Sequence, residues 1–181
     1  MLQEVDRRMV HLQLGRDVRG VVEVTHRCDC GAPDVIITEP RLPDGAPFPT
    51  TYYLTCPVLS AAIGRLEGTG LMRELQELLQ DSDLQSAYRA AHERYLADRR
   101  LVAQRAGSSV PNAIGSVSAG GMPDRVKCLH ALVAQSLACG PGVNPIGDLV
   151  LERLGAWWQQ VSCAARWMPA QEVPVAEGLP E

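Results

Sequence analysis

The first third of the chain changes from a helical to an alternating pattern of apolar positions. Val5, Met9 and Leu12 recur at helical spacing, which predicts a helix over residues 4–14 that ends at Gly15. Beyond it, runs rich in β-branched and aromatic residues alternate with turns and a proline-rich loop, which is typical of strands. The predicted strands cover residues 20–27, 35–38 and 51–55. Together they favour a small, mostly antiparallel sheet.

From Pro57 onward the apolar positions recur every three or four residues, as in α-helices. The predicted helices begin at Pro57, Leu71, the Asp81–Asp83 cap, Pro123 and Asn144. In the long helix after Asp83, most of the charged residues between Arg89 and Arg99 are expected to form a solvated face, and His92 is expected to lie at the surface. Residues 110–117 predict a further short strand.

The last predicted helix runs to Met168 and has a coiled-coil-like apolar seam. The seam consists of Val150, Leu154, Trp157, Val161, Ala164 and Met168. Prolines and glycine in residues 169–181 predict a disordered C-terminal tail. We therefore expect one α+β domain over residues 1–168, in which a small N-terminal sheet packs against a bundle of helices.

Composition narrows the range of partners and compartments. The chain has 181 residues and a net charge of −4, which gives no general attraction to nucleic acid. It contains no apolar run long enough to insert into a membrane, and its first residues lack the apolar core of a signal peptide. These features predict a cytoplasmic protein. In that compartment its six cysteines are expected to be thiols or metal ligands.

Five residues are candidate metal ligands. Cys28, Cys30 and Cys56 stand where predicted strands meet loops, and Cys128 and His130 follow a pair of glycines. If the fold gathers them, thiolates and an imidazole form the donor set that zinc or an iron–sulfur cluster prefers. Neither spacing is the Cys-x-x-Cys knuckle, so core or redox thiols are the alternative interpretation.

Helix geometry sets a condition on Cys128 and His130. Residues two apart on a helix point about 200° apart, so these two can share one metal only if their helix begins later than Pro123. A catalytic role for the pair is a second hypothesis, in which a thiolate at Cys128 is the nucleophile. His130, His26 or His92 would then be the base, and a histidine hydrogen-bonded in the core remains the alternative for His130.

The glycine junction itself is a candidate anion site. Gly120 and Gly121 allow a ligand to approach the backbone, and the N–H groups of the next turn favour a phosphate or carboxylate. Arg125 and Lys127 would neutralise that anion. The alternative is that the two glycines only make a tight turn.

Several runs of the sequence resemble an uncharacterised bacterial family, domain-of-unknown-function family 501, in its actinobacterial form. The runs are residues 14–16, 19–21, 26–35, 47–50, 52–57, 120–130 and 142–148, within a resemblance over roughly residues 5–155. The most specific are Thr55-Cys56-Pro57 and Val126-Lys127-Cys128-Leu129-His130. The resemblance implies a soluble cytoplasmic protein whose gene often lies near a septum-formation initiator and an exopolyphosphatase. Its motif residues fall on Cys30, Cys56, Cys128 and His130.

Two functions therefore remain open at this point. The first is a cytoplasmic protein with a zinc or iron–sulfur site of cysteines and His130, beside a helix start that binds a small anionic ligand. The second is a non-enzymatic adaptor for a cell-division protein, which would use the apolar face between Val150 and Met168. The residue pattern does not decide whether the protein is an enzyme.

Overall fold

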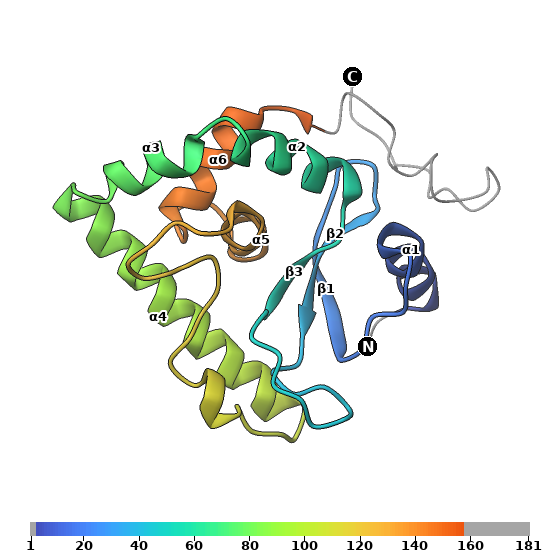
Figure 1. The fold of residues 1–181 in the computed structure, drawn as a ribbon. Helices are drawn as coiled ribbons and strands as arrows, with labels where there is room; N and C mark the ends of the chain where they lie inside the picture. Colours follow the sequence, from blue (N-terminus) through green and yellow to red (C-terminus); the bar gives the residue numbers. More distant parts are fainter. Residues whose placement is uncertain (1–2, 158–181) are drawn as a thin grey trace.

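The computed structural model describes residues 3–157 of the chain. Its three-stranded antiparallel sheet has the order β1-β2-β3 and is formed by Val21–Arg27, Pro33–Thr38 and Tyr52–Leu54. β2 is buried along its whole length, because β1 and β3 flank its edges and helices lie on both sides of the sheet (Figure 1). The predicted small antiparallel sheet near the N-terminus is confirmed.

Helix α1 (Glu4–Leu14) lies on one side of the sheet and ends, as predicted, at Gly15 in a left-handed conformation (φ 65°). Of the three apolar residues whose spacing predicted this helix, Met9 is buried, whereas Val5 and Leu12 are 46% and 36% exposed. The buried residues of α1 are Asp6, Met9, Val10 and Gln13.

Two polar contacts give α1 this orientation. Arg27 on β1 donates hydrogen bonds to both carboxylate oxygens of Asp6, at 2.8 and 2.7 Å. Gln13 donates from Nε2 to the carbonyl oxygen of Pro33 on β2, at 2.7 Å. The Arg27–Asp6 bonds are charge-assisted and therefore strong, and together with the Gln13 bond they favour this orientation over one that buries Val5.

The remaining helices pack on the other side of the sheet around α5 (Leu129–Cys139). They are α2 (Pro57–Glu67), α3 (Leu71–Leu78), α4 (Ser82–Arg105) and α6 (Pro145–Leu154). Figure 1 shows α5 end-on between α2, α4, α6 and the sheet. Leu129, Leu132 and Val133 of α5 are fully buried, so this helix forms the centre of the core. The arrangement confirms the predicted α+β class.

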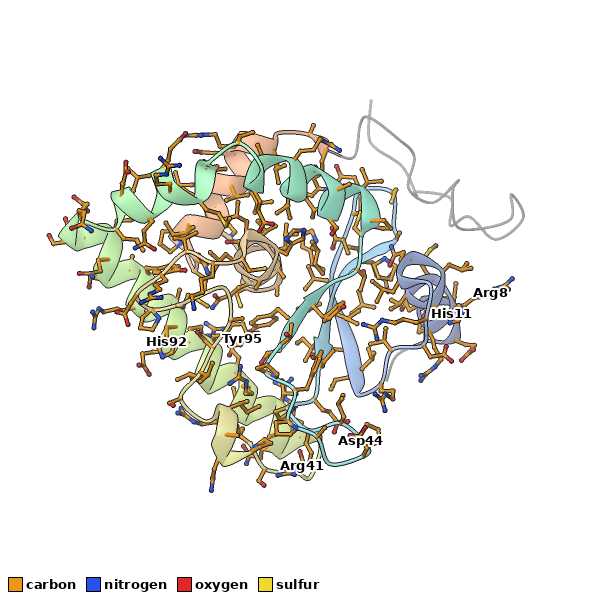
Figure 2. All side chains as sticks on the ribbon, in the orientation of Figure 1. Arg8, His11, Arg41, Asp44, His92 and Tyr95 are labelled. Carbon is orange, nitrogen blue, oxygen red and sulfur yellow. The ribbon has the colours of Figure 1, made fainter. Side chains whose placement is uncertain are left out.

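Helix α4 is the longest helix of the described chain, and Asp81 caps it by accepting hydrogen bonds from the N–H groups of Asp83 and Leu84. Arg99 is an exception to the predicted solvated face, because it is only 1% exposed. His92 is also buried, with Nδ1 lying 2.8 Å from Ser118 Oγ. Figure 2 labels His92 together with Tyr95 on α4. The helix is therefore covered on more than its apolar side.

Residues 110–117 do not form the predicted strand. They contain a short 3-10 helix, η1 (Asn112–Ile114). Instead, the Arg99 guanidinium donates hydrogen bonds to the carbonyl groups of Ile114 and Val117. A side chain thus satisfies backbone groups that a strand would pair with another strand.

Helix α6 is shorter than predicted. It ends at Leu154, and Gly155 follows with φ 56°, so the predicted continuation is wrong for residues 155–157. Val161, Ala164 and Met168 of the seam and the predicted tail lie outside the described residues, and the domain boundary at residue 168 stays a prediction. Within residues 3–157, no helix has both the length and the apolar composition to cross a membrane.

Candidate metal centre

The start of α5 decides how Cys128 and His130 lie relative to each other. The helix begins at Leu129, so the predicted start at Pro123 is wrong. Cys128 precedes it in an extended conformation, with φ −148° and ψ 105°. Cys128 is therefore outside the helical turn that carries His130, which meets the condition for the two side chains to serve one site.

The loop before α5 is held by bonds that a longer helix would break. The Val126 N–H donates to the Gln76 side chain at 2.9 Å, and the Tyr88 hydroxyl donates to the Arg125 carbonyl at 3.0 Å. These partners come from α3 and α4. The loop conformation is thus fixed by side chains from distant parts of the sequence.

Gly120 and Gly121 make a tight turn, as in the alternative interpretation. Both have positive φ, 67° and 94°, and a Cβ at Gly120 would lie 2.4 Å from the Leu132 side chain. The N–H groups of Lys127 and Arg125 donate back to the carbonyls of the two glycines, at 2.7 and 2.9 Å. These donors are therefore already bonded within the chain, and anion binding by this turn stays a prediction.

A carboxylate of the chain itself lies at the start of α5. Glu67, the last residue of α2, accepts a hydrogen bond from the Leu129 N–H at 2.8 Å through Oε1. The same oxygen lies 3.3 Å from Nδ1 of His130. A negative group at this position satisfies an orphan N–H donor and interacts favourably with the helix dipole.

Glu67, Cys128 and His130 form a group whose donor atoms all lie within 4.8 Å of one another. Sulfur, imidazole nitrogen and carboxylate oxygen are all established metal donors, so this group can hold a metal ion. The site lies between the C-terminal end of α2 and the N-terminal end of α5. All three residues are partly exposed.

The backbone of α2 determines the tautomer of His130. Nε2 lies 3.1 Å from the carbonyl oxygen of Ser60, which can only accept, so Nε2 carries the hydrogen. In the neutral ring this leaves the lone pair on Nδ1, the nitrogen that faces Glu67. Metal-binding histidines are commonly oriented by such a bond from the second ring nitrogen to a backbone carbonyl.

The same geometry bears on the catalytic hypothesis for Cys128 and His130. In a nucleophile–base–acid triad, the nucleophile and the acid lie at opposite ring nitrogens. Here both nitrogens of His130 already have an oxygen partner, Ser60 at one and Glu67 at the other. The arrangement is therefore not that of a triad, and a catalytic role for Cys128 with His130 as its base stays a prediction.

In the chain without metal, Cys128 and His130 shift each other's protonation. The hydrogen bond from His130 lowers the pKa of the Cys128 thiol below its ordinary value. The Cys128 sulfur is likewise the main cause that raises the pKa of His130 to about 9, and the Glu67 carboxylate adds to the effect. Both shifts favour the charged pair, a thiolate beside an imidazolium, over the neutral pair.

We expect Cys128 in metal-free protein to be alkylated at pH values where an ordinary thiol is mostly protonated. The rate should fall as the pH drops through the lowered pKa, because protonation removes the nucleophilic thiolate. Iodoacetamide labelling with EDTA, followed by site-resolved mass spectrometry over pH 5–10, measures this. His130→Ala should move the midpoint upward.

Cys139 is the internal control for that measurement. Burial raises the pKa of its thiol, which donates to the Tyr52 hydroxyl at 3.2 Å near the carboxylate of Asp98. Its alkylation should therefore require a higher pH than that of Cys128. Equal midpoints for the two cysteines would contradict the proposed pairing of Cys128 with His130.

The other predicted ligands lie elsewhere. Cys28 is buried in the main core, and Cys30 packs beside Met9 and Ala32. Cys56 is buried at the N-cap of α2, where its sulfur lies 3.5 Å from the Leu59 N–H donor. Among residues 3–157, the group of candidate metal donors contains none of these three cysteines. Their role as ligands stays a prediction.

Glu67 was not predicted from the sequence. It is one acidic residue at a helix end, and its contact with Leu129 spans 62 positions. No local spacing distinguishes it from the other glutamates. Only the packing of α2 against α5 brings its carboxylate to Cys128 and His130.

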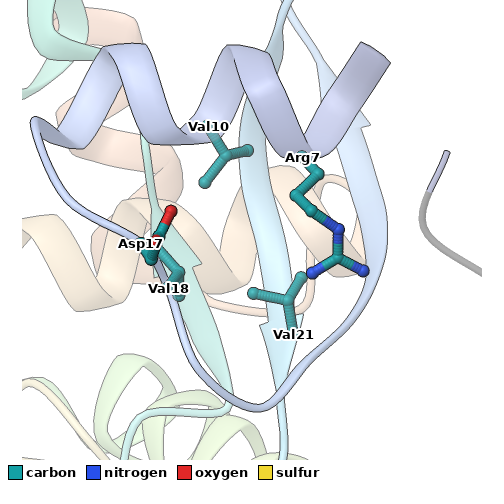
Figure 3. A pocket seen from close by; sticks show the side chains of 5 residues that line it. All are labelled: Arg7, Val10, Asp17, Val18 and Val21. Atoms are coloured by element: carbon teal, nitrogen blue, oxygen red, sulfur yellow. The ribbon is translucent and has the colours of Figure 1, made fainter. Parts of the chain in front are cut away.

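A separate hollow of about 320 Å³ lies between α1 and the chain leading into β1 (Figure 3). Its wall is formed by Val10, Val18 and Val21, with Arg7 and Asp17 beside them. Asp17 already pairs with His11 at 2.7 Å. The hollow contains none of the metal-donor residues and is distinct from the centre between α2 and α5.

Comparison with known sequences adds a family but no activity. The family model described as "Protein of unknown function (DUF501)" matches residues 24–152. That span contains Glu67, Cys128 and His130. No curated protein and no solved structure matches the chain.

Proposed function

The chain belongs to the DUF501 family, whose description assigns no activity, and we propose a function from the geometry of the site. The protein binds a zinc ion through Glu67, Cys128 and His130. The observation that carries this proposal is the placement of the three donor atoms within 4.8 Å of one another. Around tetrahedral zinc, such donors lie about 3.3–3.8 Å apart, as follows from metal–ligand distances of about 2.0–2.3 Å. Small side-chain movements are enough to close the site.

The donor set favours zinc over an iron–sulfur cluster. Clusters are held mainly by several thiolates, whereas this group offers one cysteine. One thiolate, one carboxylate and one neutral imidazole balance the charge of a divalent ion. The Nε2–H bond to Ser60 holds the imidazole in the orientation that such an ion requires.

We expect the full chain, purified without an affinity tag, to contain about one equivalent of zinc by elemental analysis. Cys128→Ser and His130→Ala should reduce this to less than about a tenth of an equivalent, because each removes one of three protein ligands. Glu67→Gln should weaken zinc binding while it keeps an acceptor for the Leu129 N–H. Competition with a chromophoric chelator measures the affinities.

Cys139→Ser is the matched control, since it removes a partly buried thiol that is outside the group. It should retain full zinc. Circular dichroism of each variant shows whether lost metal reflects lost folding. A wild-type protein that stays below about a tenth of an equivalent after zinc-supplemented growth would refute the proposal, as would equal losses in the Cys128 and Cys139 variants.

A further inference from the structure

We propose that zinc at this centre keeps an exchangeable fourth ligand, which approaches over Gly64 and is a small oxygen anion such as phosphate or a carboxylate. The inference rests on the proposed function and adds a substrate-binding position to it. Three observations carry it: the number of protein ligands, the open surface at Gly64 and an unpaired basic residue that immediately precedes Cys128.

The group provides three protein ligands within the described part of the chain. Structural zinc sites are closed by four protein ligands, whereas catalytic sites have three and bind water or substrate at the fourth position. The side chains of Glu67 and His130 are 24% and 29% exposed, so solvent reaches the donors. The ligand count and this exposure fit the open class of site.

Gly64 leaves the approach to the centre clear. On a helix, positions 60, 64 and 67 point within about 60° of one another, so Gly64 lies on the face of α2 that presents Ser60 and Glu67 to His130. Gly64 is exposed, and a Cβ built there would meet nothing within 4 Å.

Neither the backbone nor the packing requires glycine at this position. Gly64 does not have positive φ, and no neighbour crowds the place of a Cβ. Glycine inside a helix is less favourable than alanine. Gly64 therefore weakens α2 but leaves the surface between Ser60 and Glu67 open. We take this open surface as the path by which a ligand reaches the centre.

A basic residue near the centre in sequence indicates that the fourth ligand is an anion. Zinc with one thiolate and one carboxylate is formally neutral, so the charge of an incoming ligand is balanced by other groups. Lys127 immediately precedes Cys128 in sequence and is exposed. Arg65 is also exposed, but it points about 100° away from Gly64 around α2. Neither takes part in an ion pair among residues 3–157. An exposed, unpaired cation next to Cys128 in sequence favours a phosphate or carboxylate over a cationic ligand.

The test uses full-length protein in which Co²⁺ replaces zinc, because the visible spectrum of Co²⁺ reports its ligands. Inorganic phosphate and acetate are titrated separately at constant ionic strength, which distinguishes the two anion classes. At least one should change the spectrum saturably in the wild type and in Gly64→Ala. Gly64→Phe should keep the spectrum of the anion-free protein but bind the anion at least tenfold more weakly. Lys127→Gln should weaken anion binding severalfold.

Cys163→Ser tests whether the chain supplies the fourth ligand from outside residues 3–157, and it should leave the cobalt spectrum unchanged. A changed spectrum in that variant would overturn the inference. So would a cobalt spectrum that ignores both anions, or a Gly64→Phe variant that responds as the wild type does. If the wild type binds neither cobalt nor zinc, the proposed function itself has failed.

Discussion

Replacing Arg99 by alanine is expected to lower the free energy of unfolding by about 3–5 kcal/mol, a large fraction of the stability of a domain. The guanidinium is 1% exposed and donates to Thr51 Oγ1 at 3.3 Å and to the Ile114 carbonyl at 2.7 Å. It also donates to the carbonyls of Pro49 and Val117. Removing it takes this donor from three carbonyl groups, of which the Ile114 carbonyl accepts in a buried bond, and opens a cavity beside Tyr95.

Arg99 is costly to bury because the groups that accept its hydrogen bonds are neutral. Burial lowers the pKa of its guanidinium, and the ring of Tyr95, with its centroid 5.2 Å away, is its aromatic contact. The arginine nevertheless joins α4 to η1 and to the loop before β3. Losing it therefore loosens three segments together.

Arg100→Ala is the matched control, because Arg100 is the next residue on the same helix and is exposed. Its effect should stay within about 0.5 kcal/mol. Urea unfolding followed by circular dichroism measures both variants. If Arg99→Ala and Arg100→Ala unfold at the same urea concentration, Arg99 does not hold the loops as described.

The second large effect is expected for Gly147→Ala, which should destabilise the protein by about 3 kcal/mol. A Cβ at this position of α6 would lie 2.4 Å from both the carbonyl oxygen of Leu132 and Oγ of Ser136 on α5. The carbonyl belongs to a helix backbone and cannot turn aside. The two helices would have to separate at the centre of the core.

Gly64→Ala, also in a helix, is expected to have the opposite effect on stability from Gly147→Ala. The added Cβ meets nothing within 4 Å, so the better helix propensity of alanine should stabilise α2 by about 0.5–1 kcal/mol. Thermal and urea unfolding of the two variants should thus give shifts of opposite sign. Shifts of the same sign would contradict the close approach of α6 to α5 at Gly147.

The sequence predicted those elements whose signals are local. Gly15 ends α1, Asp81 caps α4, and the change of period at Pro57 marks the change from sheet to helices. Each of these depends on residues within one or two turns of the chain, which spacing and residue type describe well.

The predictions failed where a distant side chain decides the local structure. Pro123 is typical of a first helical turn, yet the loop around it is bonded to Gln76 and Tyr88, and α5 begins later. Arg99 stands among charged residues in sequence but meets backbone groups from two other segments.

The candidate site shows both situations. Cys128 and His130 are close in sequence, so they were predicted as a pair of ligands on the condition that their helix begins later than Pro123. Glu67 reaches them only through the packing of α2 on α5. For this reason the third ligand required the fold.

Helix α1 lies outside the residues that match the family model, yet it is bonded to residues inside them. The family match starts at residue 24, inside β1, and leaves α1 outside. Yet the anchor points of α1, the Arg27 guanidinium and the Pro33 carbonyl, belong to the matched span. A chain cut at residue 24 would lose the first three residues of β1 together with Asp6 and Gln13, the partners of Arg27 and Pro33. The segment outside the family match therefore contributes to the stability of the matched span.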